Sequence, residues 1–314
     1  MICGIDIGGT NTAIGIVNIK GNILCETSIK TAEYATVNLF VENIALWIQN
    51  YCTTSSEPLE GIGIGCPNGN FYTGCMLNAP NMPFKGNVHF IDLFKKYFKN
   101  LPIVLTNDAN AAAVGEMIYG KAVGLHNFAM ITLGTGLGSG FVVNDELIYG
   151  YDGLAGELGH TIIIINGRSC ACGRKGCLER YVSASGILQT YQEICTEEQC
   201  SPLYKGYKEL CEAGKKGDPY VLRCFDKTAE ILGIALANTA AITGPSHFFL
   251  FGGVAQGGSL LLKPTRAYFE KNVLFTSVGN IKIEISGLLN KNAAVLGAAA
   301  LVQKHILSIL TDEQ

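Results

Sequence analysis

The chain has 314 residues, a formal net charge of −3 at pH 7 and 48% hydrophobic residues. This length allows two domains with separate cores, and the lack of a basic surplus argues against a nucleic-acid-binding protein. No apolar run reaches the length of a membrane span and no charged-then-apolar leader opens the chain, so we expect a cytoplasmic protein without a membrane segment. Most of the 12 cysteines are then expected to be reduced thiols.

The first predicted unit is a strand over Ile2–Ile7, a glycine turn, and strands over 13–17 and 23–29. These glycines lie inside a β-hairpin, whereas a Walker loop leads into a helix and ends in Gly-Lys-Ser/Thr. The turn still offers backbone N–H groups and a hydroxyl to phosphate oxygens, and a carboxylate beside it can hold Mg²⁺ through water. A plain tight turn is the alternative. The candidate residues are Asp6, Gly8, Gly9, Thr10 and Asn11.

The next segment alternates helices with buried strands. Apolar spacing predicts helices over Val37–Tyr51 and Phe90–Phe98, and strands over Gly61–Gly65 and Ile103–Leu105. Between them, residues 66–87 form a long excursion rich in Gly, Pro and Asn. A loop of this length at the end of a buried strand is more often functional than idle.

An alanine-rich helix is predicted over 111–118, directly after Thr106-Asn-Asp-Ala-Asn110. Asn107 or Asp108 is expected to cap its N-terminus. A carboxylate at a strand end beside an asparagine is equally a candidate general base. The local sequence leaves both roles of Asp108 open.

The opening pattern then returns. A strand over Phe128–Leu133 is followed by a glycine turn over Gly134–Gly140 and a strand over Phe141–Val143. A repeated strand, glycine turn and strand predicts two related α/β halves that bind a nucleotide between them. The candidate phosphate-binding residues of the second turn are Gly134, Thr135, Gly136 and Gly138.

Three cysteines and a histidine follow within 18 residues. A Cys₃His set fills all four positions of a tetrahedral Zn²⁺ and leaves none for water, so the predicted zinc is structural. Buried thiols, disulfides of a secreted protein and a nucleic-acid zinc ribbon are the alternatives. Glu157 and Glu179 flank this segment, and the ion could orient an imidazole beside them toward a polyhydroxylated ligand. The candidate zinc ligands are His160, Cys170, Cys172 and Cys177.

The remainder reads as a helical insert and a closing α/β segment. Helices are expected over 183–198 and 204–212, and a long helix over Tyr220–Ala241. Gly252 and Gly253 follow a strand over His247–Phe251, where a flat ligand such as adenine could lie against the backbone; a plain turn is the alternative. The last predicted elements are a helix over 260–272, a strand over 281–285 and a helix over 293–306.

Six motifs occur in the order of a known family. They are Asp6-Ile-Gly-Gly-Thr-Asn, Asn107-Asp-Ala-Asn-Ala-Ala-Ala, Gly134-Thr-Gly-Leu-Gly-Ser-Gly, Glu157-Leu-Gly-His, Cys170-Ala-Cys-Gly-Arg-Lys-Gly-Cys-Leu-Glu179 and Gly252-Gly. The chain resembles the ROK family, which groups sugar kinases with sugar-responsive repressors. The similarity runs from Ile2 to about Val302, and the cysteine motif is highly specific to this family.

The resemblance implies an actin/hexokinase-like fold of two ribonuclease-H-like α/β domains around a cleft. We expect one domain over 1–117 plus 299–314 and the other, with the zinc, over 118–298. In the family, loops matching 8–11 and 134–138 bind ATP phosphates, and the aspartate matching Asp108 is the catalytic base toward the sugar's 6-hydroxyl. Many members are dimers or tetramers. The positions that match sugar-binding residues are Asn107, Asp108, Glu157, His160 and Glu179.

The expected activity is therefore Mg²⁺- and ATP-dependent phosphorylation of a hexose, with glucose first. Pro67-Asn-Gly69 and Asn81-Met-Pro-Phe84 depart from common family patterns, so N-acetylmannosamine, N-acetylglucosamine, allose and fructose stay open as substrates. A sugar-responsive repressor is the other alternative. Family repressors carry a helix-turn-helix before the first strand, and five residues precede Asp6 here. The expected partners are sugar and ATP, without nucleic acid or membrane, in a homodimer or homotetramer.

Overall fold

The computed structural model describes residues 1–289 and 292–312. In this part the chain forms two compact units. Unit 1 contains Met1–Gly124, Leu147–Ala155 and the described residues from 292 onward, and unit 2 contains Leu125–Glu146 and Gly156–Leu289. The functional domains expected from the sequence, 1–117 plus 299–314 and 118–298, remain a prediction.

Unit 1 is built on a five-stranded sheet in the order β3-β2-β1-β4-β7. The first three strands of the chain pair antiparallel, whereas β4 and β7 continue the sheet in parallel from β1. The strands are β1 (Ile2–Ile7), β2 (Asn11–Val17), β3 (Ile23–Lys30), β4 (Gly61–Gly65) and β7 (Ile103–Thr106).

Unit 2 repeats this arrangement in the order β10-β9-β8-β11-β12. Here β8 pairs antiparallel with β9 and parallel with β11, and β12 lies parallel beyond β11. The two sheets therefore share one topology, which confirms the internal repeat predicted from the two glycine turns. The strands are β8 (Phe128–Leu133), β9 (Leu137–Val143), β10 (Glu146–Leu147), β11 (His247–Phe251) and β12 (Lys282–Ile285).

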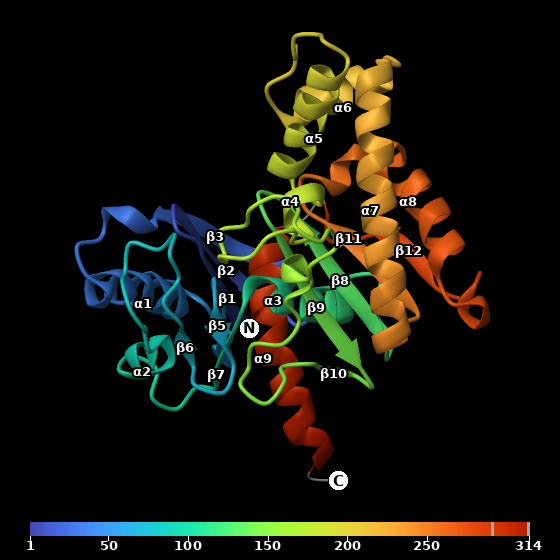
Figure 1. Ribbon diagram of the computed structural model, residues 1–314. Helices are drawn as coiled ribbons and strands as arrows, with labels where there is room; N and C mark the ends of the chain where they lie inside the picture. The colour runs from blue at the N-terminus through green and yellow to red at the C-terminus, as the bar shows by residue number, and fades with distance from the viewer. Residues whose placement is uncertain (290–291, 313–314) are drawn as a thin grey trace. The chain divides into compact units, whose positions relative to one another are not determined.

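The unit 1 sheet is covered on both faces by helices (Figure 1). Alternate residues of β1, Cys3, Ile5 and Ile7, enter a buried core with Phe40 and Ile44 of α1. This period of two is the pattern of a strand with two distinct faces. The helices of unit 1 are α1 (Val37–Thr54), α2 (Phe90–Lys95), α3 (Asp108–Tyr119) and α9 (Ala293–Asp312), with a 3-10 turn η1 (Thr31–Glu33).

Close packing places α9 on the opposite face of that sheet. A Cβ atom at Gly4 of β1 would overlap the carbonyl oxygen of Val295. A Cβ at Gly297 would lie 2.6 Å from the carbonyl oxygen of Ala111 on α3. Because no side chain separates these backbones, α9 is held tightly against both β1 and α3.

In unit 2, α7 and α8 lie side by side, and α5 and α6 pack against α7 (Figure 1). The long helix α7 begins at Pro219, where the Asp218 side chain accepts hydrogen bonds from two free backbone N–H groups, and ends before a left-handed Gly244. The helices are α4 (Glu179–Val182), α5 (Ala184–Glu197), α6 (Tyr207–Lys215), α7 (Pro219–Thr243) and α8 (Ser259–Asn272), with 3-10 turns η2 (Leu158–His160), η3 (Ala255–Gly257) and η4 (Phe275–Ser277).

Several element boundaries predicted from the sequence are wrong. The second glycine turn ends before Leu137 instead of Gly140, because the residues after it pair with β8 as strand β9. The helix α2 ends at Lys95. The helix α6 begins three residues later than predicted and extends to Lys215. The long excursion over 66–87 also contains a small hairpin of β5 (Gly69–Asn70) and β6 (Cys75–Met76).

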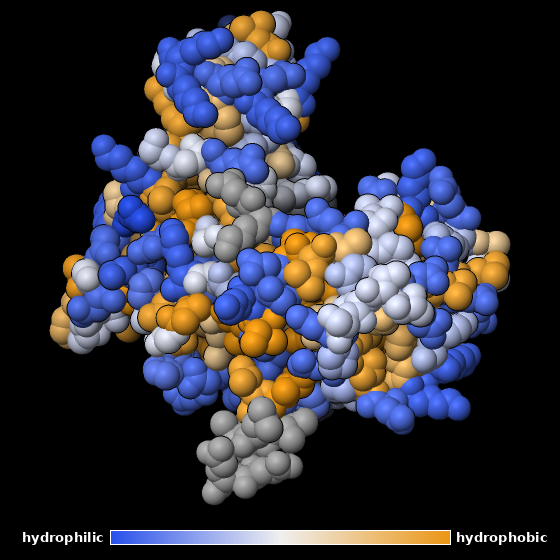
Figure 2. Space-filling view, turned by 180° about the vertical axis from the view of Figure 1, so that it is seen from behind, coloured by the Kyte–Doolittle hydropathy of each residue, from blue (hydrophilic) through white to orange (hydrophobic). Residues whose placement is uncertain are grey.

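The surface seen in Figure 2 carries hydrophobic side chains in small groups between hydrophilic ones. Exposed apolar residues such as Ile242 and Phe275 are ordinary when they stand singly. Among the described residues, no helix combines the length and the apolar character needed to cross a membrane.

Candidate functional site

Two carboxylates meet at the carboxyl edge of the parallel strands in unit 1. Asp6 near the end of β1 lies opposite Gly65 of β4, and Gly65 lies opposite Thr106, which ends β7. A Cβ at Gly65 would lie 3.6 Å from Asp6 Oδ1 and 3.9 Å from Asp108 Cα. In open α/β sheets this edge is where ligands bind.

The N-cap of α3, beside this edge of the sheet, is Asn107. This decides between the two roles that the sequence left open for Asp108, helix cap and general base. The Asn107 side chain accepts a hydrogen bond from the Asn110 backbone N–H at 2.7 Å. Asp108 is the first residue of α3, and its side chain accepts a hydrogen bond from the Ala109 N–H at 2.9 Å. The Asp108 residue is exposed at the helix start. Capping therefore belongs to Asn107, and the Asp108 carboxylate is available to a ligand.

Both carboxyl groups are easier to protonate than a free aspartate. Burial, followed by the negative charge of Asp108, raises the pKa of Asp6 to about 7. Asp108 can be reached by solvent, but protein atoms surround most of its carboxyl group, and this desolvation raises its pKa. Hydrogen bonds from backbone N–H groups, including that of Ala109, oppose part of the effect. The nearby Cys66 thiol is fully buried, and burial with both carboxylates raises its pKa far above the usual range. Two adjacent carboxylates in such surroundings favour a bound cation or a proton-accepting role.

The raised pKa of Asp6 predicts a pH-dependent cost to folding. A carboxyl group with a pKa of about 4 in the unfolded chain and about 7 in the folded one binds more protons when folded, so stability falls as pH rises between these values. We expect Asp6→Asn to stabilise unit 1 at pH 8 by roughly 1 kcal/mol or more and to give no gain at pH 4. Thermal unfolding without divalent cations measures this.

The control for this experiment is Glu42→Gln on the exposed side of α1. Its unfolding temperature should change by the same small amount at both pH values. If Asp6→Asn gives an equal shift at pH 4 and pH 8, the pKa assigned to Asp6 is contradicted.

The glycine turn of unit 1 is tightly braced. The Gly8 N–H donates to the Asn11 carbonyl at 3.0 Å, and the Thr31 hydroxyl donates to the Gly8 carbonyl at 2.7 Å. The Thr31 N–H also donates to the Thr10 carbonyl at 2.9 Å. A Cβ at Gly8 would lie 2.7 Å from the Asn11 carbonyl oxygen. This glycine is therefore required by the turn itself, and the side chains of Thr10 and Asn11 are exposed beside it.

The two departures from the family pattern have structural roles. A Cβ at Gly9 would overlap the Asn81 carbonyl oxygen, so the second segment packs against the glycine turn. Phe84 is buried and packs on Phe40 with ring centroids 5.2 Å apart, so its ring contributes to the core. In the first segment, Asn68 adopts a left-handed φ of 51°.

The second glycine turn borders a cavity of about 550 Å³ in unit 2. The Gly134 N–H donates to the Gly136 carbonyl at 2.9 Å, and the Ala184 N–H at the start of α5 donates to the Gly134 carbonyl at 2.9 Å. The Gly138 N–H, already on β9, donates to the Thr132 hydroxyl oxygen at 3.2 Å. The lining residues are Gly134, Thr135, Ala184, Tyr207, Lys208, Cys211, Glu212, Lys215, Gly253, Val254 and Gln256.

Two glycines of this cavity are not required by the fold. A Cβ at Gly134 or Gly253 would meet nothing within 4 Å, and neither residue has a left-handed φ. Gly252 differs, because its φ is 98° and a Cβ there would lie 2.5 Å from the Leu133 carbonyl oxygen. Glycine at 134 and 253 therefore leaves open a part of the cavity that any larger side chain would occupy. A ligand that binds close to the backbone at these two positions would explain why both residues are glycine.

The glycine turn is fastened to the cysteine segment through Leu137. The Glu179 carboxylate accepts a hydrogen bond from the Leu137 N–H at 3.0 Å, and a Cβ at Gly136 would lie 2.6 Å from Glu179 Oε2. A Cβ at Gly159, next to His160, would overlap the Leu137 carbonyl oxygen. Movement of the cysteine segment would therefore displace the turn.

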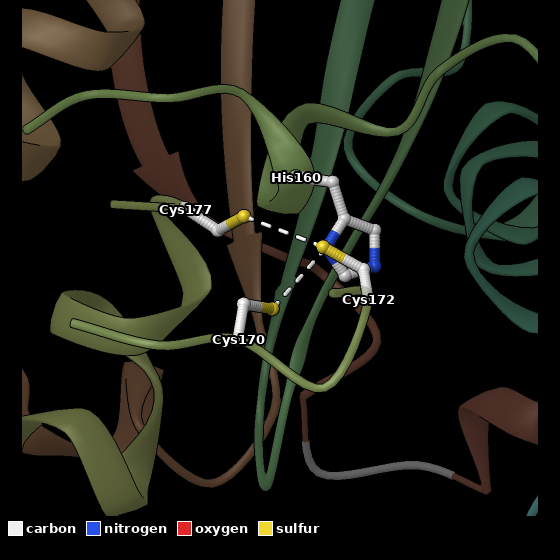
Figure 3. Close-up of side chains that lie close together, drawn as sticks. All are labelled: His160, Cys170, Cys172 and Cys177. Atoms are coloured by element: carbon white, nitrogen blue, oxygen red, sulfur yellow. Dashed lines mark hydrogen bonds between the residues drawn. The ribbon is translucent and has the colours of Figure 1, made fainter. Parts of the chain in front are cut away.

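The four candidate zinc ligands converge (Figure 3). Their ligand atoms all lie within 4.8 Å of one another. The Cys170 sulfur is 3.8 Å from His160 Nδ1, and the sulfurs of Cys172 and Cys177 are 3.6 Å apart. A tetrahedral ion with bonds of about 2.0–2.3 Å separates its ligand atoms by about 3.3–3.8 Å. The donor set and its spacing therefore fit Zn²⁺, and the second ring nitrogen of His160 points away from the sulfurs (Figure 3).

The loop that carries the cysteines is shaped by glycines with positive φ, 86° at Gly173 and 82° at Gly176. Hydrogen bonds with Arg174 lower the pKa of the Cys172 thiol to about 6. Burial and the neighbouring thiols raise the pKa of Cys177 to about 12. Three thiolates this close together would repel one another. A divalent cation bound by all three would offset their negative charge.

Sequence reasoning missed the face of α6 that lines the cavity, Lys208, Cys211, Glu212 and Lys215. Their spacing of three, four and seven residues marks one side of a helix and was the available signal. It also missed Asn110, which is buried on the first turn of α3. Within the described residues, the Asn110 side-chain oxygen has no hydrogen-bond partner.

The chain is similar to known proteins of one family over nearly its whole length. A family model described as "ROK family" matches residues 2–305. A glucokinase of Halalkalibacterium halodurans is 35% identical and covers 96% of this chain and 94% of its own length. A xylose repressor of Caldicellulosiruptor bescii is 30% identical and covers 98% of this chain and 79% of its own. Among solved structures, a glucokinase of Streptomyces griseus in complex with glucose and AMPPNP is similar, with a TM-score of 0.77, 31% identity, and 96% and 98% of the two chains covered.

Proposed function

Because the chain belongs to the ROK family, we propose that it is an ATP-dependent hexose kinase that phosphorylates the 6-hydroxyl of glucose. Its fold is the actin/hexokinase-like ATPase fold that the sequence predicts. The observation that carries the proposal is the repeated strand, glycine turn and strand, because its second copy borders a cavity of about 550 Å³ with two glycines that the fold does not need. Such turns present backbone N–H groups to phosphate oxygens.

In the proposed reaction Asp108 is the general base. It accepts the proton of the sugar's 6-hydroxyl as that oxygen attacks the γ-phosphorus of ATP and ADP leaves. The raised pKa of its carboxyl group supports this role, because a base works best when its pKa approaches the operating pH. Asp6 would hold Mg²⁺ through water. When bound, Mg²⁺ neutralises the charge of the phosphates.

The sugar's remaining hydroxyls are assigned to Asn107, Glu157, His160 and Glu179, as the family resemblance implies. His160 and the three cysteines would hold structural Zn²⁺, which when bound fixes the cysteine loop. The outward direction of the second His160 nitrogen supports a hydrogen bond from this ring to a ligand (Figure 3).

ATP phosphates are assigned to both glycine turns, and adenine to the backbone at Gly252 and Gly253. Gly253→Val tests the second assignment. The valine side chain would enter open space, so we expect normal stability, while the KM for ATP rises at least about tenfold because the cavity is partly filled. Steady-state kinetics with varied ATP measures this.

The matched control is Gly206→Val, since a Cβ at this glycine also meets nothing within 4 Å and the residue lies outside the cavity. Its KM for ATP should stay that of the wild type. An unchanged KM in Gly253→Val would remove adenine from this wall.

A sugar panel tests the function itself. ATP consumption coupled to a reporter should be highest, as kcat/KM, with glucose, and lower with N-acetylmannosamine, N-acetylglucosamine, allose and fructose. The similarity to xylose repressors favours a sugar-responsive regulator as the second candidate. Sugar binding without any phosphorylation would support that candidate.

We further propose that the protein is cytoplasmic and forms a homodimer or homotetramer. Light scattering of the purified protein tests the oligomeric state.

A further inference from the structure

We propose that one face of α6 recognises the nucleoside of the phosphoryl donor, with Glu212 as the specificity-determining residue. The inference rests on the proposed kinase function and extends it, since the glycine turns account for phosphates and backbone but leave one wall of the cavity without a role. That wall is the face of α6 formed by Lys208, Cys211, Glu212 and Lys215.

The cavity has two chemically different sides. Gly134 and Thr135 offer the turn that suits phosphate oxygens, and Gly253 with Val254 offers a backbone surface. The α6 side adds a carboxylate, Glu212, to this lining. A carboxylate repels phosphate oxygens but accepts hydrogen bonds from hydroxyl and amino groups, and the part of a nucleotide that carries such donors is the nucleoside.

Apolar lining supports the same assignment. Ala184, Val254 and the buried Cys211 line the cavity, and a flat base suits such surroundings better than a polyanion does. The two lysines flank Glu212 on the same helix face, four residues before and three residues after it. Their alkyl stems can cover a base while their ammonium groups offset the charge of Glu212 and of the donor's phosphates.

The helix is held in place, so its face keeps a fixed direction. The Tyr207 hydroxyl donates to the Val254 carbonyl at 2.7 Å, which ties the start of α6 to the loop after β11. A Cβ at Gly257 would overlap the same hydroxyl. The opposite face of α6 buries Leu210 completely. A preorganised wall is what selective recognition requires, because the ligand does not have to order it.

Titration calorimetry with ADP and with inorganic tripolyphosphate tests the proposal without relying on turnover. Tripolyphosphate retains the phosphate chain and lacks the nucleoside. For Glu212→Ala we expect the Kd for ADP to rise about tenfold, as for one lost hydrogen bond to a charged group, and the Kd for tripolyphosphate to change less than about twofold. Glu212 is exposed on α6, so the variant should fold normally, which circular dichroism checks.

Controls are Lys216→Ala, the residue that follows α6, and Glu230→Ala on α7, both outside the cavity. Each should bind both ligands like the wild type. An ADP affinity that is unchanged in Glu212→Ala overturns the inference, and so does an equal loss for ADP and tripolyphosphate, which would place Glu212 at the phosphates. A wild type that binds neither ligand overturns the proposed function, so the two failures are distinguishable.

Discussion

Replacing Asp108 by asparagine should lower kcat by about 10²–10⁴-fold while glucose still binds. Asparagine has nearly the same shape and can still accept the Ala109 N–H hydrogen bond, but it cannot take the proton of the 6-hydroxyl. The helix cap is unaffected, because Asn107 provides it. Steady-state kinetics and calorimetric titration with glucose separate the loss of chemistry from the loss of binding.

The matched control is Asp92→Asn, because Asp92 occupies the first turn of α2 as Asp108 occupies the first turn of α3. This control should retain full activity and similar stability. An Asp108→Asn enzyme with kcat within a few fold of the wild type would show that another group, or none, accepts the proton. A variant that loses glucose affinity but keeps kcat would assign Asp108 to binding alone.

Cys172→Ser should lose zinc, stability and activity together. The sulfur of Cys172 lies 3.6 Å from that of Cys177, within a cluster whose four ligand atoms fit one tetrahedral ion. Without one thiolate the ion binds weakly, and the loop loses the metal bonds that hold its two ends together. We expect a loss of about 3 kcal/mol or more, which lowers the unfolding temperature by about 10 °C.

Metal analysis of the purified protein, thermal unfolding and kinetics measure these three effects. Cys200→Ser is the control, because this partly exposed cysteine belongs to unit 2 and lies outside the cluster. It should keep one zinc per chain. Activity of Cys172→Ser should fall because Leu137 links the cysteine segment to the second glycine turn. Full activity in a metal-free Cys172→Ser protein would refute the scaffold role of the ion.

Local pattern was sufficient for most strands of the two sheets, although the short edge strand β10 was not predicted. The β-branched run at Ile2–Ile7 and the largely apolar run at Phe128–Leu133 form β1 and β8, and the glycine turns after them occupy equivalent places in two sheets of the same topology. The family predicted from six motifs is confirmed. The convergence of three cysteines and one histidine was also predictable, because four residues in 18 positions leave the loop few other ways to close.

Other features depend on contacts that sequence order hides. Asn107 rather than Asp108 caps α3, and only the side-chain geometry decides between adjacent cap candidates. Phe84 ends a segment that departs from the common family pattern, and the sequence did not show that its ring packs on Phe40, which lies far away along the chain. Gly134 and Gly253 differ from Gly252 in backbone φ and in what surrounds each Cα, and the sequence shows neither. The cavity wall on α6 belongs to a helix whose spacing alone does not say what it faces.

The most direct test of the account is the identity of the product formed from glucose, ATP and Mg²⁺. Phosphorus NMR and mass spectrometry should show one phosphate on the sugar at carbon 6 for each ADP released, and 6-deoxyglucose should yield no phosphorylated sugar. Phosphate at another carbon, or ADP release without any sugar phosphate from any hexose, would contradict it.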